Sequence, residues 1–317
     1  MPILIHILRN TWQTLLIFWV LVRIMIPVAI LMEALSRIGA IEALAPAFAP
    51  ILAQLGLPPE LGLAWLTGLL VGIWGAVPLI FSLVPVSSLS VADVTVFSAL
   101  LLISHGLPIE QKIIQQAGPK MLTTTLLRIF GGLFYAFLLH KLFAATGWLS
   151  APVAPTWIPL SATHSWIEYG RDLGETTLSM LIILLGLSWG LELLRVTGLL
   201  DLMMTALSPL LRLAGIRGDA EHFTAVGLLL GISYGAGLLI REARAGKIAP
   251  RQIFLSCVFM GFAHAVIEDT LVMVSLGADV FGILIGRLAF AVAITAGNAA
   301  LLRCWTARVS EGPRPRT

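Results

Sequence analysis

Apolar runs of about twenty residues recur along the whole chain, separated by short polar, glycine- or proline-containing stretches. Clear examples are Leu15–Leu35, Leu61–Val84, Met121–Leu139 and Leu178–Leu194. As a helix that rises about 1.5 Å per residue, each run is long enough to cross a hydrocarbon core about 30 Å thick. The runs do not alternate apolar and polar residues, which favours helices over the strands of a barrel. The pattern therefore predicts an all-α polytopic membrane protein.

A second pattern is an internal repeat. When the sequence is shifted by 159 residues, its two halves align without a gap from about Glu33 to Arg128. Polar residues and glycines coincide, including Glu33 with Glu192, Gly72 with Gly231, His105 with His264, Glu110 with Asp269, and Arg128 with Arg287. Leucine matches would be expected by chance in so apolar a chain, but matches of His, Arg and Glu would not. We therefore interpret the two halves as a duplication.

Each half is expected to contain about five helical segments. We assign residues 1–143 to unit one, 144–174 to an interfacial linker, 175–305 to unit two and 306–317 to a cytoplasmic tail. In unit one the segments are Leu15–Leu35, Ile41–Leu55, Leu61–Val84, Val91–Gln116 and Met121–Leu142, and in unit two they are Leu178–Leu194, Leu200–Ala214, Phe223–Ile240, Gln252–Leu276 and Val280–Leu302. The linker carries Pro155, Trp157 and Pro159, which suit a connection with aromatic anchors at the membrane surface.

The basic residues predict that the two units have opposite orientations. In unit two the loop 241–251, between the third and fourth segments, carries four basic residues and should be cytoplasmic, whereas its counterpart in unit one, 85–93, has none. The next loop reverses this bias, with Lys112 and Lys120 in unit one and no basic residue in unit two. Inverted repeats require an odd number of crossings per unit. The second and third segments together must then supply an even number, as a re-entrant hairpin or as two full spans.

Composition narrows the function further. The chain is 58% hydrophobic and 12% charged, and its mean hydropathy is +0.96. Its net charge of +3 lies in short loops and the tail, so we expect the lipid bilayer and no nucleic acid as its partner. Cys257 and Cys304 are too few for a disulfide framework or a thiolate metal site. Since no nucleophile–base arrangement or zinc-protease motif occurs, we expect neither an enzyme nor a cofactor.

The third segment of each unit is rich in glycine. It reads GLLVGIWGAVP in unit one, with Gly72 and Gly75, and GLLLGISYGAG in unit two, with Gly231 and Gly235. Glycine allows backbone conformations that interrupt a helix, and interrupted helices expose backbone groups at the substrate sites of many secondary transporters. Close packing of helices through glycine is the alternative. We predict a break in both segments.

The fourth segment carries the sharpest chemical signal, SHGLPIEQ in unit one and AHAVIEDT in unit two. The candidate ion- or substrate-binding residues are His105, Glu110, His264, Glu268 and Asp269. On an unbroken helix His264 and Glu268 lie on one face, and Pro108 is expected to open unit one enough to bring Glu110 near His105. A His–carboxylate pair within a span can relay a proton or bind a divalent cation, or it can be a structural hydrogen-bonded pair.

Five further polar residues are candidates. Arg128 and Arg287 lie about 12 Å into the fifth segments, where they are placed to pair with Glu110 and Asp269 or to bind an anionic group. Glu33 and Glu192 end the first segments and are interfacial or functional. Asn298 has no polar counterpart in unit one, which makes it a candidate for an asymmetric substrate contact.

The glycine-broken segments, each followed by SHGLPIE or AHAVIED, resemble the Gate family of nucleoside recognition domains. Two such copies cover about residues 10–305. Related domains occur in concentrative nucleoside transporters, B-type ferrous-iron transporters and spore maturation proteins. The resemblance implies membrane transport, and we expect a multi-pass protein of the bacterial inner (plasma) membrane with both termini cytoplasmic. The iron transporters carry a cysteine followed by Asn-Val-Pro, where this chain has Gly75-Ala76-Val77-Pro78 and so lacks the thiolate.

Three hypotheses follow. The first is a secondary transporter, coupled to protons or ions, for a small polar or anionic solute bound between the two units. The second is a divalent-metal permease that uses the histidines and carboxylates of the fourth segments. The third is a non-transporting membrane scaffold. A homo-oligomer is compatible with each of them.

Overall fold

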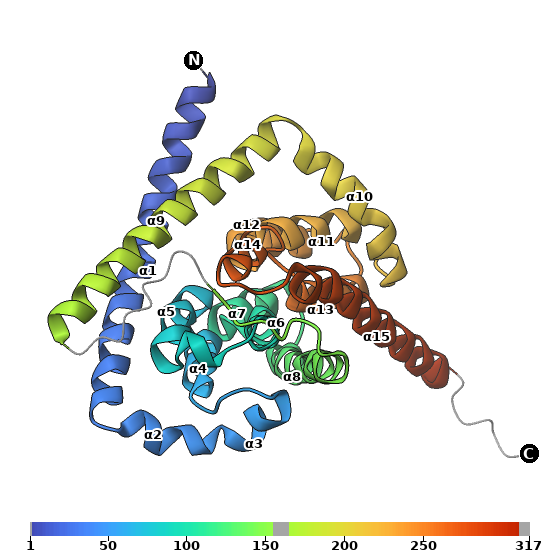
Figure 1. Cartoon of the computed structure of the whole chain (residues 1–317). Helices are drawn as coiled ribbons and strands as arrows, with labels where there is room; N and C mark the ends of the chain where they lie inside the picture. Colours follow the sequence, from blue (N-terminus) through green and yellow to red (C-terminus); the bar gives the residue numbers. More distant parts are fainter. Residues whose placement is uncertain (1, 155–164, 311–317) are drawn as a thin grey trace, which may run out of the picture.

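The computed structural model describes residues 2–154 and 165–310, and all regular elements within these ranges are helices. This confirms the all-α prediction. The first half contains α1 (Pro2–Arg37), α2 (Ala40–Leu44), η1 (Ala45–Ala47), α3 (Ala49–Leu52), η2 (Ala53–Leu55), α4 (Leu61–Val71), α5 (Ile73–Leu83), η3 (Val86–Ser88), α6 (Val91–Ser104), α7 (Leu107–Ala117) and α8 (Met121–Thr146). The second half contains α9 (Trp166–Val196), α10 (Leu199–Leu213), α11 (Asp219–Leu230), α12 (Ile232–Arg244), α13 (Pro250–Phe262), α14 (Glu268–Ser275), the π-helix η4 (Phe281–Gly286) and α15 (Arg287–Ser310) (Figure 1).

One predicted boundary differs from the structure. Helix α9 begins at Trp166, so the last part of the expected linker 144–174 is helical. The linker residues Pro155, Trp157 and Pro159, and positions 311–317 of the tail, lie outside the described residues.

The long helices α1 and α9 form an outer frame in which they cross one another (Figure 1). Their contact includes polar bonds: Thr14 Oγ1 donates to Ser188 Oγ at 2.7 Å, and Tyr169 Oη donates to the carbonyl of Ala29 at 2.9 Å. Inside this frame, helices α6, α7, α8 and α13 form the centre of the molecule, with α15 packed on α13 (Figure 1). The frame therefore leaves the histidine- and arginine-bearing segments at the core.

The two units contact one another reciprocally. The histidine segment of unit one, α6, packs on η4 of unit two, and the histidine segment of unit two, α13, packs on α8 of unit one. Hydrogen bonds link the same elements, since Asp279 N donates to Thr95 Oγ1 at 2.8 Å and Tyr135 Oη donates to the carbonyl of Gly282. The interface between the units is thus built from their fourth and fifth segments.

Both glycine-rich segments are broken, as predicted. The breaks lie at Gly72, with φ +113°, between α4 and α5, and at Gly231, with φ +87°, between α11 and α12. In unit one the two helices pack on each other, and a Cβ placed on Gly75 would lie 3.4 Å from Thr67 Cγ2. The chain therefore turns back at Gly72. Helices of 11 residues span only about half of a hydrocarbon core, which matches a re-entrant hairpin.

The histidine segments are broken as well. Helices α6 and α7 meet at a bend of 41°, and in unit two α13 ends at Phe262 while α14 starts at Glu268. The prediction that His264 and Glu268 share one face of an unbroken helix is therefore wrong. The cause is a left-handed residue directly after each histidine, Gly106 with φ +60° and Ala265 with φ +46°.

A backbone bond ties the two breaks of each unit together. Gly106 N donates to the carbonyl of Gly68 at 2.9 Å, and Val266 N donates to the carbonyl of Leu228 at 3.0 Å. A buried backbone N–H needs a partner, and the glycine-broken helix supplies it at the point where the histidine helix has stopped. Each histidine is thereby fixed beside the preceding interrupted segment.

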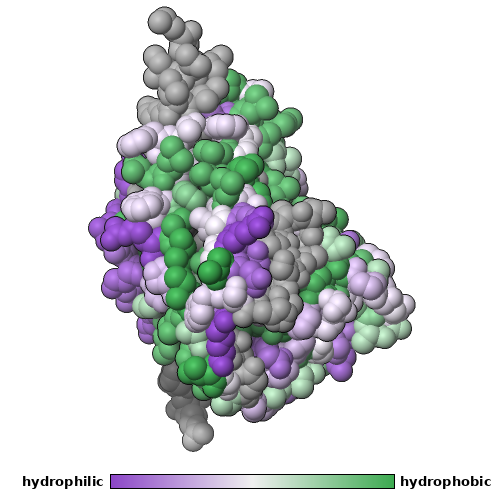
Figure 2. Space-filling model, turned by 60° about the vertical axis from the view of Figure 1, so that its left-hand side comes forward, coloured by the Kyte–Doolittle hydropathy of each residue, from purple (hydrophilic) through white to green (hydrophobic). Residues whose placement is uncertain are grey.

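Three helical stretches in the described residues are long and apolar enough to cross a membrane, namely Met121–Thr146, Trp166–Leu194 and Phe281–Cys304, and the bent pair α6–α7 makes a fourth if it counts as one span. One face of α8 exposes an apolar side chain at every fourth position, at Leu122, Leu126, Phe130, Phe134, Leu138 and Leu142. In Figure 2 hydrophobic residues cover broad areas of the visible face, and hydrophilic residues lie in separate patches. Such apolar surface suits contact with lipid.

The left-handed conformations of Gly106 and Ala265 predict different effects of substitution on the free energy of unfolding. Gly106→Ala should lower the free energy of unfolding by about 1–2 kcal/mol, because an L side chain disfavours this conformation and the new Cβ would touch the Glu110 carboxyl at 3.4 Å. Ala265→Gly relieves the same strain and should stay within about 1 kcal/mol of the parent protein. Unfolding by SDS in mixed micelles measures both. Gly170→Ala is the control, because this helical glycine faces open space; equal losses for Gly106→Ala and Gly170→Ala would contradict the prediction.

Candidate functional site

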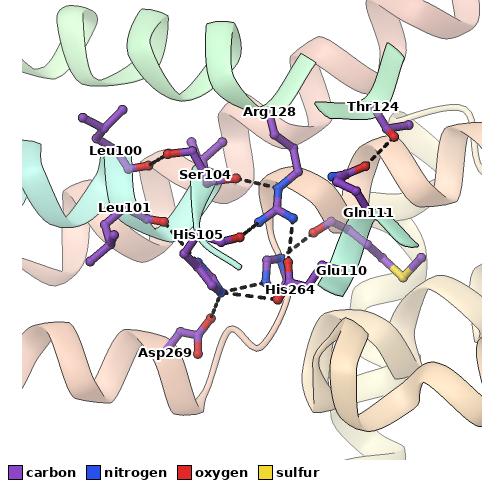
Figure 3. Close-up of polar contacts among 12 residues, drawn as sticks. Leu100, Leu101, Ser104, His105, Glu110, Gln111, Thr124, Arg128, His264 and Asp269 are labelled. Atoms are coloured by element: carbon purple, nitrogen blue, oxygen red, sulfur yellow. Dashed lines mark hydrogen bonds and ion pairs between the residues drawn. The ribbon is translucent and has the colours of Figure 1, made fainter. Parts of the chain in front are cut away.

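The two histidine breaks meet at the interface of the units. His105 Nε2 and His264 Nε2 lie 3.2 Å apart, although the residues are 159 positions apart in the sequence. Both side chains are buried, with 6% and 1% of their surface exposed, and their ring centroids are 4.9 Å apart. Figure 3 shows the two rings pointing toward each other from the ends of α6 and α13. The duplicated motif therefore forms one site rather than two.

The other ring nitrogen of each histidine is held by its own helix. His105 Nδ1 lies 3.1 Å from the carbonyl of Leu101, and His264 Nδ1 lies 2.9 Å from the carbonyl of Met260. A carbonyl oxygen only accepts, so each Nδ1 must carry the hydrogen in these bonds. In a neutral imidazole the Nε2 atom is then a bare acceptor. The site therefore directs two lone pairs at each other.

Glu110 brings a third acceptor to the same point. Its Oε1 lies 3.2 Å from His264 Nε2 and 3.5 Å from His105 Nε2, and its Oε2 lies 2.6 Å from Arg128 Nη1. Pro108 lies in the first turn of α7, which starts directly after the break. This confirms the prediction that the break brings Glu110 to His105, and it adds that Glu110 also reaches the histidine of the other unit.

Arg128 is fully engaged despite its depth. Only 1% of its surface is exposed, and its guanidinium also donates from Nε to the carbonyl of Ile103 at 2.7 Å and from Nη2 to the carbonyl of His105 at 3.0 Å. It therefore satisfies backbone groups that the break in the helix has freed, and it holds Glu110 in place (Figure 3). Of the two roles considered for Arg128, pairing with Glu110 or binding an anionic group, the structure shows the pairing with Glu110.

The corresponding pair in unit two is not formed. Arg287 is fully buried and has a single long bond, 3.5 Å from Nη2 to the carbonyl of His264, while its Nε and Nη1 have no hydrogen-bond partner in the described part of the chain. Asp269 Oδ2 also lacks a hydrogen bond and instead lies 3.9 Å from His105 Nε2. The shorter side chain of Asp269 has one methylene fewer with which to reach both the cluster and the arginine. Of the two roles considered for Arg287, pairing with Asp269 or binding an anionic group, the structure does not show the pairing with Asp269.

Sequence patterns do not indicate the π-helix that precedes Arg287. Its residues Phe281–Gly286 are apolar or glycine, and the counterpart in unit one belongs to the regular helix α8. Tyr135 reaches across the interface to bond the carbonyl of Gly282 within it. π-Helices are rare and occur frequently at functional sites. The sequence offers only an indirect indication of this contact, namely a tyrosine, Tyr135, in an otherwise apolar stretch.

Several predicted site residues lie outside the cluster. Glu33 pairs with Arg37 on its own helix at 2.7 Å, Asn298 donates to the carbonyl of Ile294 at 2.9 Å, and Glu192 lies on α9 in the outer frame. Glu268 is half-buried at the start of α14, and among the described residues the ion-pair partner of His264 is Glu110 rather than Glu268. Gly72 and Gly231 form the helix breaks, whereas Gly75 and Gly235 lie within α5 and α12.

The charges of the cluster are nearly balanced without any ligand. Two carboxylates, Glu110 and Asp269, face two guanidiniums, Arg128 and Arg287, and the two imidazoles are neutral when only Nδ1 is protonated. Three acceptor atoms nevertheless converge within 3.5 Å of one another. Acceptors repel unless positive charge lies between them. The chemistry available to this site is therefore the binding of a cation, either a proton or a metal ion.

The Glu110–Arg128 pair predicts a large effect on stability. Glu110→Ala should lower the free energy of unfolding by about 3–5 kcal/mol, because it leaves a buried guanidinium without a counter-charge. Glu175→Ala is the matched control, since its pair with Arg171 is exposed and is worth about 0–1 kcal/mol. SDS unfolding of both variants checks this. A loss for Glu110→Ala no larger than that for Glu175→Ala would show that the buried pair is not structural.

Comparison with known proteins agrees with the membrane assignment. An uncharacterized membrane protein of Bacillus subtilis (strain 168), YvoD, is 26% identical over 297 residues, which cover 90% of this chain and 92% of the relative. No solved structure matches the chain. The model of the Gate family, described as nucleoside recognition, matches twice, at residues 18–120 and 177–280. The starts of the two matches, residues 18 and 177, are separated by the same 159 positions that separate His105 from His264. The chain is therefore a membrane protein of the Gate, or nucleoside recognition, family, which is associated with membrane transport.

Proposed function

We propose that this protein is a cation-coupled secondary transporter of the inner membrane that moves a small polar or anionic solute between its two inverted units, with both termini cytoplasmic. The observation that carries this proposal is the convergence of His105, His264 and Glu110 at the buried interface of the units. The cation between these acceptors is the coupling ion, a proton or a metal ion.

The cost of burying charge supports a functional role. Ionisable side chains within a membrane are expensive and mark ion or substrate pathways by default. Here both units contribute to one cluster, so any motion of one unit against the other changes the distances among the same few atoms. Cation binding is thereby linked to the relative position of the units, as alternating access requires.

The packing of the helices that follow the breaks differs between the two units in a way that suits such motion. Helix α7 of unit one packs along α12 of unit two, whereas the described residues show no comparable packing of α14 on α5, the counterpart contact. The side chain of Asp269, in the first turn of α14, is 12% exposed, and that of His264 is 2% exposed. Within the cluster Asp269 is thus the more accessible of the two, which supports an approach to the site from the side of α14.

A second candidate, a divalent-metal permease, is favoured by one specific observation. His105, His264 and Asp269 each offer a ligand atom, and these atoms lie within 4.8 Å of one another. In that case the cation of the cluster is itself the transported species.

Transport assays on reconstituted protein test the proposal. Proteoliposomes are supplied with labelled nucleosides, carboxylates or inorganic phosphate, under an imposed pH gradient or with Zn²⁺ or Mn²⁺ on one side. We expect a cation gradient to drive uptake of at least one solute. His105→Ala and His264→Ala should reduce this flux at least tenfold, because each removes one of the converging acceptors, about 1.4 kcal/mol or more in free energy.

His222→Ala is the control for these variants, since His222 is an exposed histidine on α11. It should retain the flux. Thermal melts of each variant in detergent separate function from folding. If both cluster variants lost folded protein in proportion to their lost flux, or if no gradient drove any solute, the transport proposal would fail.

A further inference from the structure

The positions of the acceptor atoms match the ligand set of one particular class of cation. We propose that His105 Nε2, His264 Nε2 and Glu110 Oε1 bind a single divalent transition-metal ion such as Zn²⁺, Fe²⁺ or Mn²⁺, with Asp269 as the fourth ligand. The inference rests on the proposed function for the role of the site in transport, but not for the binding itself.

The distances between the three ligand atoms agree with a tetrahedral ion. In such a site the metal lies about 2.0–2.1 Å from nitrogen and oxygen ligands, so two ligands lie about 3.3–3.4 Å apart. The three edges formed here are 3.2, 3.2 and 3.5 Å. One ion placed just above this triangle reaches all three atoms at bonding distance without any movement of the backbone.

A proton fits the same triangle less well. One proton can bridge only one pair of the three acceptors, and the third acceptor then faces a lone pair at 3.2–3.5 Å. Protonation of both imidazoles places two N–H groups head to head at 3.2 Å, where like charges repel in a poorly solvated interior. A metal ion contacts the three acceptors simultaneously and removes this conflict.

The surroundings of the three ligands are those of a metal site. Ligating histidines almost always donate their other ring N–H to a carboxylate, a backbone carbonyl or water, and ligating carboxylates are themselves hydrogen-bonded. Leu101 and Met260 supply the carbonyls for the two histidines, and Arg128 holds the second oxygen of Glu110 at 2.6 Å. All three ligands are therefore oriented before an ion arrives.

Asp269 provides an independent indication of a ligand. Its Oδ2 atom is buried, makes no hydrogen bond to any described residue, and lies 3.9 Å from His105 Nε2. This distance is about 0.5 Å longer than a tetrahedral edge, and the ligand atoms of His105, His264 and Asp269 all lie within 4.8 Å of one another. The failure of Asp269 to pair with Arg287 leaves this carboxylate free to complete the coordination of an ion.

Ligand type and charge define the class of ion. Imidazole nitrogens with carboxylate oxygens suit Zn²⁺, Fe²⁺ and Mn²⁺, whereas Mg²⁺ and Ca²⁺ prefer six or more oxygen ligands. The carboxylates of Glu110 and Asp269 balance the guanidiniums of Arg128 and Arg287, so a divalent ion adds two positive charges to the cluster. Uncompensated charge in a poorly solvated interior opposes permanent retention. Reversible binding is what a transported or coupling ion requires.

Metal titration of the purified full-length protein in detergent tests the inference. After treatment with chelator, calorimetry with Zn²⁺ alone should show one ion per chain. Co²⁺ should give the intense visible absorption of a tetrahedral complex, which octahedral Co²⁺ at a surface site does not give. Asp269→Asn should weaken Zn²⁺ binding at least about tenfold. This variant is expected to fold, because Asp269 Oδ2 makes no hydrogen bond in the described structure and the amide has the same shape as the carboxylate.

His264→Ala should abolish the tetrahedral Co²⁺ bands, and His222→Ala should retain both the bands and the affinity. The inference is overturned if folded protein binds none of Zn²⁺, Fe²⁺ and Mn²⁺, or if His264→Ala and Asp269→Asn bind as well as His222→Ala. Uptake of solute driven by a pH gradient, with no metal binding, would overturn the metal site and leave the transport proposal standing. One tight metal site without any transport would overturn the transport proposal and leave the metal site standing.

Discussion

The burial of charge at the junction of two apolar units is the constraint on which the rest of this structure depends. Arg128 and Arg287 are among the largest fully buried side chains in the described residues, and burying a guanidinium is costly unless other groups accept its hydrogen bonds. The helix breaks supply those groups, because the carbonyls of Ile103, His105 and His264 are freed from helical bonding where each histidine helix ends. The broken helices, the arginines and the histidines are therefore one structural unit.

Much of this organisation could be predicted from the sequence because it rests on local chemistry. Glycines at Gly72 and Gly231 allow the left-handed residues that break a helix, and both breaks are present. Pro108 similarly indicated the break that brings Glu110 to His105. In each case the residue type that causes the break lies at the break itself, so no knowledge of distant contacts was needed.

The features that sequence analysis missed depend on tertiary contact. His264 was expected to pair with Glu268 four residues later, but its carboxylate partner is Glu110 of the other unit. Ala265 adopts a left-handed conformation that its side chain disfavours, and only the surrounding packing and the bond from Val266 to Leu228 impose it. The similarity of Glu110 and Asp269 also concealed a real difference, since Glu110 pairs with Arg128 whereas Asp269 Oδ2 makes no hydrogen bond to any described residue. The inverted orientation of the units remains a prediction from the basic loop residues.

The small exposed area of Asp269 has a consequence for the order of events at the cluster. Its side chain is 12% exposed, more than those of His105, Glu110 and His264. In the proposed metal site, a hydrated ion that approached from this side would meet the carboxylate of Asp269 before the imidazoles and Glu110. Its waters could then be replaced one after another by Asp269, the two imidazoles and Glu110. Dehydration would thereby be divided into successive steps, so that no single step would carry the whole hydration free energy of the ion.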